Sequence, residues 1–453
     1  MSGIQSLKIG VSGVRGIVGQ SLTPQLVVGF AEAFGTYLDG GVVVIGRDPR
    51  PSGEMIRDAL IGGLLSTGCS VIDVGVCPTP TMQHAVVDLA ADGGIGITAS
   101  HHPAAWNALK FCREDGVFLN EYQAEELLSV YHQGAFVLRG SGELGRVGRD
   151  EGAINRHLTK VLMSVDREAI AALAPRVVVD SVNGAGADCA EGLLQKMGCD
   201  VVAINDVPTG HFPREPEPIP ENLGQLCAAV LQHGADIGFG QDADGDRLSV
   251  VSAEGVAIGE EFTLAFAADV MAEREPGTLV TNLSTSRMID EVAERHGCTV
   301  VRSKVGEVNV VETMIAEGAV GGGEGNGGVI DPKLHHCRDN LAAMALILQG
   351  MARHRVSVAE WAVSFRPSAI IKDKVPCRAG HTQRAVLALQ RHYEGRGMDR
   401  TEGVKVFFED GAWLHARPSN TEPIIRVIAE ADDGLQAREL CDEAMRVVAE
   451  AVT

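Results

Sequence analysis

The sequence lacks an excess of basic residues. Its 453 residues contain 39 Lys and Arg against 60 Asp and Glu, which gives a formal net charge of −21. Nucleic acids and anionic membranes are bound through surplus positive charge, so this balance argues against either as a partner. Small anionic substrates stay possible, because a few focused basic residues can hold a phosphate inside an acidic protein.

Features of export and membrane insertion are also missing. Residues 1–5 lack the charged-then-apolar pattern of a signal peptide, and no uninterrupted apolar run approaches ~20 residues. The ten cysteines are scattered without a CxxC pair, and several lie in apolar contexts. This pattern favours reduced thiols in the core. We therefore expect a cytoplasmic protein, with no membrane and no nucleic acid as partner.

One short pattern, Gly-Cys followed by a β-branched strand, occurs three times, at 68–73, 198–203 and 297–302. Each copy follows an amphipathic, helix-like run, and each run follows a β-branched strand. The runs are 55–66, 187–197 and 288–296, and the strands are 42–46, 176–180 and 278–282. Strand, helix, Gly-Cys turn and strand thus recur as a βαβ unit in triplicate. The glycine fits a helix C-terminus, where a left-handed conformation is needed.

A further strand and an unusual loop follow each copy: TASHHP at 98–103, QDADGDR at 241–247 and GGEGNGG at 322–328. Ligands of open α/β sheets gather where strands end, so we expect three related domains to offer these loops to a shared cleft. The alternative is that α/β proteins repeat such units through common physics alone. From about residue 366, local strand pairing with helices on one face indicates a small α+β domain. The expected domains are 1–153, 154–255, 256–366 and 367–453.

The second loop sets Asp242, Asp244 and Asp246 on alternate residues after an apolar strand at 236–240. Alternation sends these carboxylates to one face, where they repel each other unless a cation lies between them. An EF-hand loop would need Glu at its twelfth position, which here is Ala253. The pattern predicts a bound divalent metal, and a solvated acidic turn is the alternative.

Ser100 lies in the first loop, between a strand and Pro103. An isolated serine there could be a helix N-cap. Its place at a strand end, equivalent to that of the aspartate loop, and Lys110 ten residues later favour a catalytic role instead. No GxSxG elbow surrounds Ser100, so nothing indicates a hydrolase triad. A serine beside a divalent metal suits phosphoryl transfer.

The last domain contains a candidate anion site. The segment RPSNTEP at 417–423 offers a guanidinium, hydroxyls, an amide and turn N–H groups, and Arg426 follows on the next strand. Such a loop can form a nest for a phosphate, although a Pro-bounded turn favours the same residues. Near the N-terminus, Arg15 stands between glycines, where the backbone can approach a ligand. The segment GRDPRPSG at 46–53 is less specific, because Asp48 can simply pair with its arginines.

These motifs together resemble the α-D-phosphohexomutase superfamily over nearly the whole chain. SGVRG, GRDPRPSG, PTP (78–80), TASHHP, EPEPIPENL (215–223), DADGDR, GGEGNGG and RPSNTEP occur in the expected order. The resemblance implies three repeated α/β domains with mixed sheets and a C-terminal α+β domain, heart-shaped around a central cleft. The four domains would carry, in order, the active serine loop, the metal loop, the sugar-binding loop and the phosphate-binding loop.

The resemblance also implies a mechanism. Ser100 would be carried as phosphoserine, and Asp242, Asp244 and Asp246 would bind Mg²⁺ together with a phosphate oxygen of that serine. The enzyme would give its phosphate to a hexose phosphate and take the other phosphate back from a 1,6-bisphosphate. Glucose or glucosamine 1,6-bisphosphate would act as activator, and the enzyme would be a monomer or homodimer. Lys110 and Arg15 would assist catalysis, and the substrate would be held by Arg247, Lys304, Glu324, Asn326, Arg417, Ser419, Asn420, Thr421 and Arg426.

Two departures from the family pattern bear on the substrate. His102 stands where Asn is common, and the sugar loop has Asn326 and Gly328 where many bacterial members have Ser and His. This variant is similar to the archaeal-type branch of phosphoglucosamine mutases. We therefore expect interconversion of glucosamine 6-phosphate and glucosamine 1-phosphate, with a phosphomannomutase/phosphoglucomutase on neutral sugars as the alternative. A metal-dependent sugar phosphatase is a rival reaction, whereas a non-catalytic sugar-phosphate-binding protein should have lost Ser100 or an aspartate.

Overall fold

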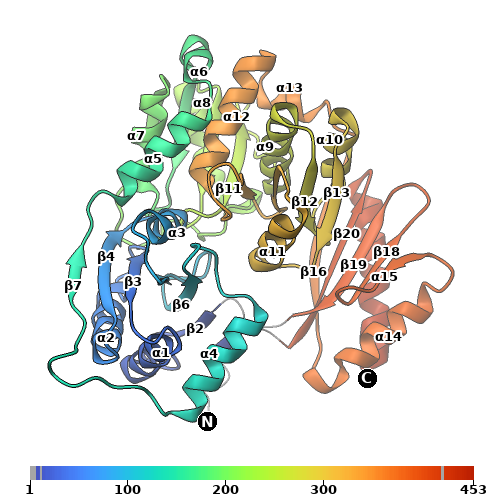
Figure 1. The fold of residues 1–453 in the computed structure, drawn as a ribbon. Helices are drawn as coiled ribbons and strands as arrows, with labels where there is room; N and C mark the ends of the chain where they lie inside the picture. The colour runs from blue at the N-terminus through green and yellow to red at the C-terminus, as the bar shows by residue number, and fades with distance from the viewer. Residues whose placement is uncertain (1–6, 11–12, 420–422, 453) are drawn as a thin grey trace.

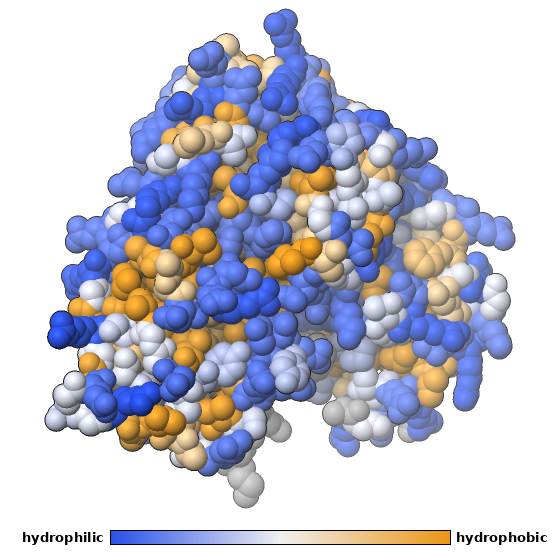
Figure 2. Space-filling view, viewed as in Figure 1, coloured by the Kyte–Doolittle hydropathy of each residue, from blue (hydrophilic) through white to orange (hydrophobic). Residues whose placement is uncertain are grey.

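The computed structural model describes residues 7–10, 13–419 and 423–452. These residues form four sheets arranged in an arc, from the N-terminal unit at lower left to the C-terminal unit at right (Figure 1). A notch separates these two end units in the space-filling view, and hydrophilic side chains predominate on this face (Figure 2). Among the described residues, no helix combines the length and apolarity needed to cross a lipid bilayer.

The first unit has a seven-stranded sheet of order β1-β2-β6-β5-β3-β4-β7. Its strands are β1 Lys8–Gly10, β2 Gly13–Ile17, β3 Val42–Arg47, β4 Ser70–Val76, β5 Gly93–Ile97, β6 Trp106–Arg113 and β7 Val147–Arg149. Its helices are α1 Pro24–Tyr37, α2 Gly53–Ser66, α3 Thr79–Asp88 and α4 Glu121–Gln133. Local signals set the ends of α4: Asn120 and Gln123 form a capping box at its start, and Gly134 ends it in a left-handed conformation.

The second and third units each have a four-stranded sheet. The second contains β8 Arg176–Asp180, β9 Asp200–Ile204, β10 Ile237–Gln241 and β11 Leu248–Ser252, with α5 Ala153–Ser164, α6 Arg167–Leu173, α7 Ala187–Lys196 and α8 Gly224–His233. The third contains β12 Thr278–Asn282, β13 Thr299–Ser303, β14 Gly321–Glu324 and β15 Gly328–Ile330, with α9 Glu260–Arg274, α10 Met288–His296, α11 Glu307–Glu317, α12 Asn340–His354 and α13 Val358–Ala362.

The expected triplicate unit is confirmed by strand order and direction. The order β6-β5-β3-β4 of the first sheet recurs as β11-β10-β8-β9 and as β15-β14-β12-β13. In each copy the first three strands along the chain run parallel, and the fourth pairs antiparallel with the third. The Gly-Cys glycines Gly68, Gly198 and Gly297 all have positive φ, as their place at helix ends requires. The serine, aspartate and sugar loops therefore occupy the same topological position, the turn between the third and fourth strands.

The second and third units share one apolar core. Helix α12 is buried from Asn340 to Met351 and packs against α9, α6 and α5. A helix that is apolar on every side is stable only inside a protein, so α12 ties the two units together. Eight of the ten cysteines are buried and all ten are free thiols, as their scattered pattern indicated.

The C-terminal unit is an antiparallel sheet of order β16-β20-β19-β18-β17. Its elements are β16 Ala369–Pro376, α14 Thr382–His392, β17 Gly397–Asp399, β18 Val404–Phe407, β19 Trp413–Pro418, β20 Ile424–Ala431 and α15 Gly434–Val452. The two helices pack against each other and against the sheet around a core that includes Leu389, Val427 and Cys441. The sequence predicted this α+β arrangement for the region after residue 366.

Candidate active site

The serine loop holds Ser100 in an unusual conformation. Its φ of 50° lies in the left-handed region, which is disfavoured for residues with a Cβ. The side chain is buried, and the Ser100 amide donates to Thr98 Oγ1 at 2.9 Å. Such a strained residue persists only where its surroundings hold it firmly, and strained residues cluster at functional sites.

The Arg50 side chain holds the serine loop through its main-chain carbonyl groups. It has no exposure to solvent, and its guanidinium pairs with the equally buried carboxylate of Asp48 at 2.8 Å. The same guanidinium donates to four main-chain carbonyl oxygens of the loop: Ser100 at 2.6 Å, His102 at 2.7 Å, Pro103 at 2.7 Å and Trp106 at 3.2 Å. The expectation that Asp48 pairs with an arginine is confirmed. The clamp on the loop was missed, since main-chain acceptors leave no pattern in the sequence.

The aspartate loop faces Ser100. The ligand oxygens of Asp242, Asp244 and Asp246 lie within 4.8 Å of one another, and all three side chains are buried. Ser100 Oγ donates to Asp242 Oδ2 at 3.0 Å. The turn closes tightly because the amides of Asp246 and Arg247 both donate to Asp242 Oδ1 at 3.1 Å. The structure thus brings together two loops that are about 140 residues apart in the sequence.

Lys110 reaches the same carboxylates from β6. Its Nζ lies 2.9 Å from Asp244 Oδ2 and 3.7 Å from Asp246 Oδ2. Burial lowers the pKa of Lys110, but the carboxylates of Asp244, Asp246 and Glu307 outweigh burial, so the pKa is raised. Lys110 is therefore an ammonium at neutral pH, a source of positive charge rather than a base.

The three aspartates suit a divalent cation. Burial, then the charges of Asp246 and Asp244, raise the pKa of Asp242 well above its usual range. Asp244 Oδ1 and Asp246 Oδ1 are buried and have no hydrogen-bond partner among the described residues. Hard cations such as Mg²⁺ prefer carboxylate oxygens, and a cation here would satisfy both atoms and relieve the repulsion.

Thr79, from the PTP motif at the start of α3, supports the aspartate loop. Its hydroxyl donates to Asp244 Oδ2 at 2.9 Å, and its amide donates to the Asp244 carbonyl oxygen at 2.8 Å. Gly245, with φ of 74°, packs against Pro78 so closely that a Cβ there would lie 2.9 Å from the Pro78 Cβ. The PTP motif of the first unit therefore fixes the aspartate loop of the second unit.

Arg338 joins the aspartate loop to the sugar loop and was missed by sequence reasoning. Its guanidinium donates to Asp246 Oδ2, lies 2.9 Å from Glu324 Oε2 and lies 3.2 Å from Glu307 Oε2. Burial lowers the pKa of Arg338, but Asp246, Glu307 and Glu324 outweigh burial and raise it well above its usual range. One buried cation thus ties together three acidic groups of two units.

The sugar loop begins at the end of β14. Glu324 is buried, and its Oε1 accepts from Asn282 Nδ2 at 2.8 Å and from the Gly306 amide at 2.9 Å. Asn326 Oδ1 accepts from the Gly328 amide at 3.2 Å, so Asn326 shapes the loop. Lys304 precedes Gly306 on the neighbouring connection and is exposed. Lys304 therefore sits close in sequence to a residue that contacts Glu324.

Two arginines lie side by side on β19 and β20, next to the RPSNTEP segment. Arg417 on β19 and Arg426 on β20 are paired in register across the sheet. Arg417 Nη1 lies 3.2 Å from Glu402 Oε1, while Glu402 Oε2 accepts from the amide of Val305 in the third unit at 2.7 Å. The Ser419 amide donates to the Ile424 carbonyl oxygen at 3.0 Å. Asn420 and Thr421, also expected here, lie outside the described residues.

Further cationic and imidazole groups surround Ser100. Arg15 Nη1 lies 3.2 Å from His102 Nδ1, and burial, then the charge of Arg247, lowers the pKa of Arg15 to about 10. Arg247 Nη1 lies 3.2 Å from Glu217 Oε1. His101 Nδ1 is 3.4 Å from Ser100 Oγ, and burial, then Arg247, lowers the pKa of His101 well below its usual range. His101, which was only part of the TASHHP motif in the sequence, is thus a neutral imidazole beside the serine hydroxyl.

Known proteins share this architecture along the whole chain. Sequence profiles of the phosphoglucomutase/phosphomannomutase family match in order: α/β/α domain I at residues 6–137, domain II at 155–255, domain III at 259–367 and the C-terminal domain at 373–447. A Methanopyrus kandleri protein named "probable phosphoglucosamine mutase" is 38% identical, covering 97% of each chain. A Thermococcus kodakarensis protein named "phosphoglucomutase/phosphomannomutase" is 39% identical, covering 98% of each chain.

A solved structure extends the comparison to three dimensions. The crystal structure of a phosphoglucomutase/phosphomannomutase family protein from Burkholderia thailandensis superposes with a TM-score of 0.85 at 24% identity, covering 100% of this chain and 98% of that one. It shares the fold described above. Profiles, relatives and fold agree, so the chain belongs to the phosphoglucomutase/phosphomannomutase family of the α-D-phosphohexomutase superfamily and is an isomerase that transfers phosphate intramolecularly.

Proposed function

We propose that this phosphohexomutase carries its phosphate on Ser100, uses Mg²⁺ at Asp242, Asp244 and Asp246, and interconverts glucosamine 6-phosphate and glucosamine 1-phosphate. The observation that carries the proposal is the contact between the two loops, with Ser100 Oγ 3.0 Å from Asp242 Oδ2. A phosphate on Ser100 would lie against the carboxylate cluster, where only a bound cation makes such proximity favourable. When bound there, Mg²⁺ would offset the charge of the phosphate oxygens.

The transfer cycle needs no reactant other than the phosphorylated enzyme and the hexose phosphate. The free hydroxyl of the hexose phosphate attacks the phosphorus on Ser100. A new P–O bond to the sugar oxygen forms, and the bond between phosphorus and Ser100 Oγ breaks. One proton moves from the sugar hydroxyl to the Ser100 side chain. The product is a 1,6-bisphosphate. After it turns around, Ser100 Oγ attacks the other phosphorus, and a proton returns to the sugar oxygen that is released.

The side chains around Ser100 have different roles in this phosphate transfer. Lys110 remains charged and stabilises the phosphate oxygens, because its pKa is raised. His101, as a neutral imidazole 3.4 Å from Ser100 Oγ, is a candidate proton carrier beside the charged Lys110 and Arg15. Arg15 keeps its charge at neutral pH and serves phosphate binding and electrostatic stabilisation.

Each of the four units, with the boundaries 1–153, 154–255, 256–366 and 367–453, contributes one loop to the cycle. Glu324 and Asn326 bind sugar hydroxyls. Arg247 and Lys304 contact the substrate or its phosphate. The phosphate that does not react is held by Arg417, Ser419, Asn420, Thr421 and Arg426. Holding it at one distant site lets either end of the bisphosphate face Ser100, because the same arginine pair accepts both ends.

The substrate preference is supported by the sugar loop. The relatives divide between the phosphoglucosamine mutase and phosphoglucomutase/phosphomannomutase names at nearly equal identity. The Glu324-Gly325-Asn326 loop, similar to that of the archaeal-type branch of phosphoglucosamine mutases, favours glucosamine. Neutral hexose phosphates are the alternative substrate class.

Parallel turnover assays with glucosamine, glucose and mannose 1-phosphates test the preference. We expect the highest kcat/KM with the glucosamine ester, no turnover after chelation, and recovery with Mg²⁺. A lower kcat/KM for glucosamine than for both neutral sugars would overturn the substrate assignment. Undiminished turnover in chelator would overturn the metal assignment, and release of inorganic phosphate in place of bisphosphate would indicate a phosphatase.

A further inference from the structure

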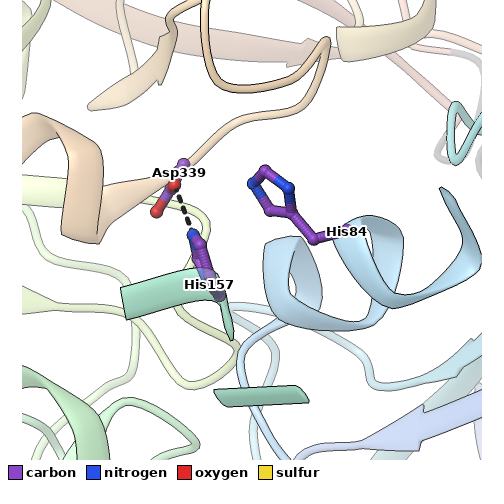
Figure 3. Close-up of side chains that lie close together, drawn as sticks. All are labelled: His84, His157 and Asp339. Carbon is purple, nitrogen blue, oxygen red and sulfur yellow. Dashed lines mark hydrogen bonds and ion pairs between the residues drawn. The ribbon is translucent and has the colours of Figure 1, made fainter. Parts of the chain in front are cut away.

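A second cluster of ligand-type side chains lies at the junction of three units. His84 comes from α3, His157 from α5, and Asp339 is the N-cap residue of α12. Their candidate ligand atoms lie within 4.8 Å of one another, and all three side chains are buried. Figure 3 shows the three side chains converging on one point. The proposed mutase chemistry uses none of them.

Two members of the cluster are held firmly in place. His157 Nε2 lies 2.8 Å from Asp339 Oδ2, and His157 Nδ1 lies 2.8 Å from Thr81 Oγ1. Asp339 Oδ1 caps α12 by accepting from the amides of Leu341 and Ala342. Only Oδ2 of Asp339 therefore faces the point of convergence, and the His157 ring has a fixed orientation toward it.

The third member has an unsatisfied nitrogen. His84 is 2% exposed, and its Nε2 has no hydrogen-bond partner among the described residues. In Figure 3 this edge of the ring faces His157 and Asp339. A buried polar atom without a partner costs about 1–3 kcal/mol, and a ligand bound to this nitrogen would remove that cost. The hydrogen bond from His157 to Asp339 alone leaves this nitrogen unexplained.

We propose that His84 Nε2, His157 Nε2 and Asp339 Oδ2 bind a divalent cation of the Zn²⁺ class, at a site separate from the aspartate loop. Two imidazoles and one carboxylate form a ligand set typical of Zn²⁺, which is usually four-coordinate. Mg²⁺ prefers oxygen ligands and retains several waters, so it suits the three aspartates and not this site. The chain would then hold two metals of different chemical classes.

The hydrogen positions are compatible with metal binding at His157. In the hydrogen-bonded arrangement Nε2–H donates to Asp339, and Nδ1 accepts from the Thr81 hydroxyl. With metal on Nε2, the proton resides on Nδ1 and the Thr81 hydroxyl rotates to accept it, because a hydroxyl can do either. A fixed partner for the second ring nitrogen is the usual support of a metal-bound histidine.

His84 needs one rearrangement. Lys160 Nζ lies 3.2 Å from His84 Nδ1 and also donates to Asp88. With metal on Nε2, Nδ1 carries a proton, so Lys160 must give up this contact and keep only Asp88. Burial, then His157, His335 and Lys160, lowers the pKa of His84 well below its usual range, which keeps the ring in the neutral form that metals bind.

Lys160 lines a surface pocket and also contacts the cluster. A surface pocket of about 330 Å³ is lined by Asp88, Asn155, Arg156, Thr159 and Lys160. The Lys160 ammonium contacts His84 Nδ1 at 3.2 Å. Movement of this one side chain would open the pocket to the His84 ring.

A cation at this site would stabilise the arrangement of the units around the active site. Helix α3 begins at Thr79, which donates to Asp244, and α12 follows Arg338, which donates to Asp246. A cation bound to both helices and to α5 would hold the three units that position the aspartate loop.

Equilibrium dialysis of the purified full chain against Zn²⁺, with Mg²⁺ saturating throughout, tests the proposal. We expect one Zn²⁺ per chain in wild type and at least a tenfold weaker affinity in His84→Gln. His211→Gln, at an exposed histidine elsewhere, is the matched control and should bind as wild type. Lys160→Met should bind more tightly, and Co²⁺ in place of Zn²⁺ should give visible absorption bands typical of four-coordination.

Several results would contradict the proposed Zn²⁺ site. No Zn²⁺ binding by either wild type or Lys160→Met would overturn the proposal and identify the cluster as a purely hydrogen-bonded junction. Equal affinity in wild type and His84→Gln, or loss of binding in His211→Gln, would place the ion elsewhere. If His84→Gln fails to fold, Lys160→Met decides, because an affinity no tighter than that of wild type contradicts the role of His84 Nε2.

Discussion

The Arg50 guanidinium donates a hydrogen bond to the Ser100 carbonyl oxygen at 2.6 Å, from a position with no solvent exposure. The Ser100 hydroxyl, which we propose carries the phosphate, is therefore positioned by a side chain that does not touch it. Three further carbonyl bonds from the same guanidinium hold the rest of the turn. The left-handed φ of Ser100 persists because Arg50 satisfies the carbonyl groups that the turn directs inward.

Arg50→Lys should destabilise the protein and reduce turnover. Lysine offers one ammonium in place of a planar fork, so it cannot reach four carbonyls and Asp48 together. We expect a loss of about 2–4 kcal/mol in unfolding free energy and at least a tenfold fall in kcat, measured by denaturant unfolding and steady-state assay. Arg57→Lys, at a more exposed ion pair with Asp58, should change stability by about 0.5 kcal/mol or less. Wild-type kcat in Arg50→Lys would contradict the positioning role.

Arg338→Met should affect stability and metal binding in opposite directions. Removing the guanidinium leaves Asp246, Glu307 and Glu324 without their shared buried partner, which should cost about 3–5 kcal/mol of unfolding free energy. Loss of a positive charge beside Asp246 should also tighten Mg²⁺ binding in calorimetric titration. A matched change at the exposed pair of Arg176 with Asp200 should do neither. Weaker Mg²⁺ binding in Arg338→Met would show that Arg338 organises the loop more than it competes with the cation.

Arg417→Met should raise KM more than it lowers kcat. The proposed role of Arg417 is to hold the phosphate that does not react, and a charged hydrogen bond contributes about 1.5–3 kcal/mol. The expected fall in kcat/KM is about ten- to hundredfold, carried by KM in initial-rate measurements. Arg438→Met, at a half-exposed pair with Asp373, serves as control. An unchanged KM would mean that Glu402 keeps Arg417 occupied when substrate is bound.

Glu261 should give the stability a pH dependence between about pH 4.5 and 7. Burial raises the pKa of Glu261 to about 7, although Lys372 at 3.0 Å acts in the opposite direction. The native state therefore binds this proton more tightly than the unfolded chain does. The resulting stability is complete below about pH 4.5 and is lost as the pH rises through 7, a change of about 3 kcal/mol.

Glu261→Gln should flatten this part of the curve of unfolding free energy against pH. Denaturant melts at several pH values between 4.5 and 7.5 measure it. Glu439→Gln, on the exposed face of α15, should leave the slope as in wild type. If Glu261→Gln retains the full slope, another group is responsible.

Sequence patterns predicted elements best where periodicity was strong. The expected strands 176–180 and 278–282 and the helix 288–296 coincide with β8, β12 and α10. Ser100 and the aspartates could be paired in advance because equivalent loops of a repeated unit meet at one edge. The three exposed residues of β7 gave no such pattern and were not foreseen.

Residues that act through long-range polar contacts escaped prediction. Arg338 lies 92 residues from Asp246, and Arg50 lies 50 residues from Ser100. Neither has a spacing that marks its function, because the partners are carbonyl oxygens or carboxylates supplied by tertiary folding. The same holds for His84, His157 and Asp339, which come together only at the junction of three units.

Mass spectrometry of the protein quenched during turnover tests the central proposal most directly. With glucosamine 1,6-bisphosphate as activator and Mg²⁺ present, we predict one added phosphoryl group, located on the peptide that contains Ser100, and free bisphosphate in solution. Ser100→Ala should acquire no phosphate and should lose turnover. Full turnover by Ser100→Ala, or a phosphoryl group located on another residue, would contradict the account.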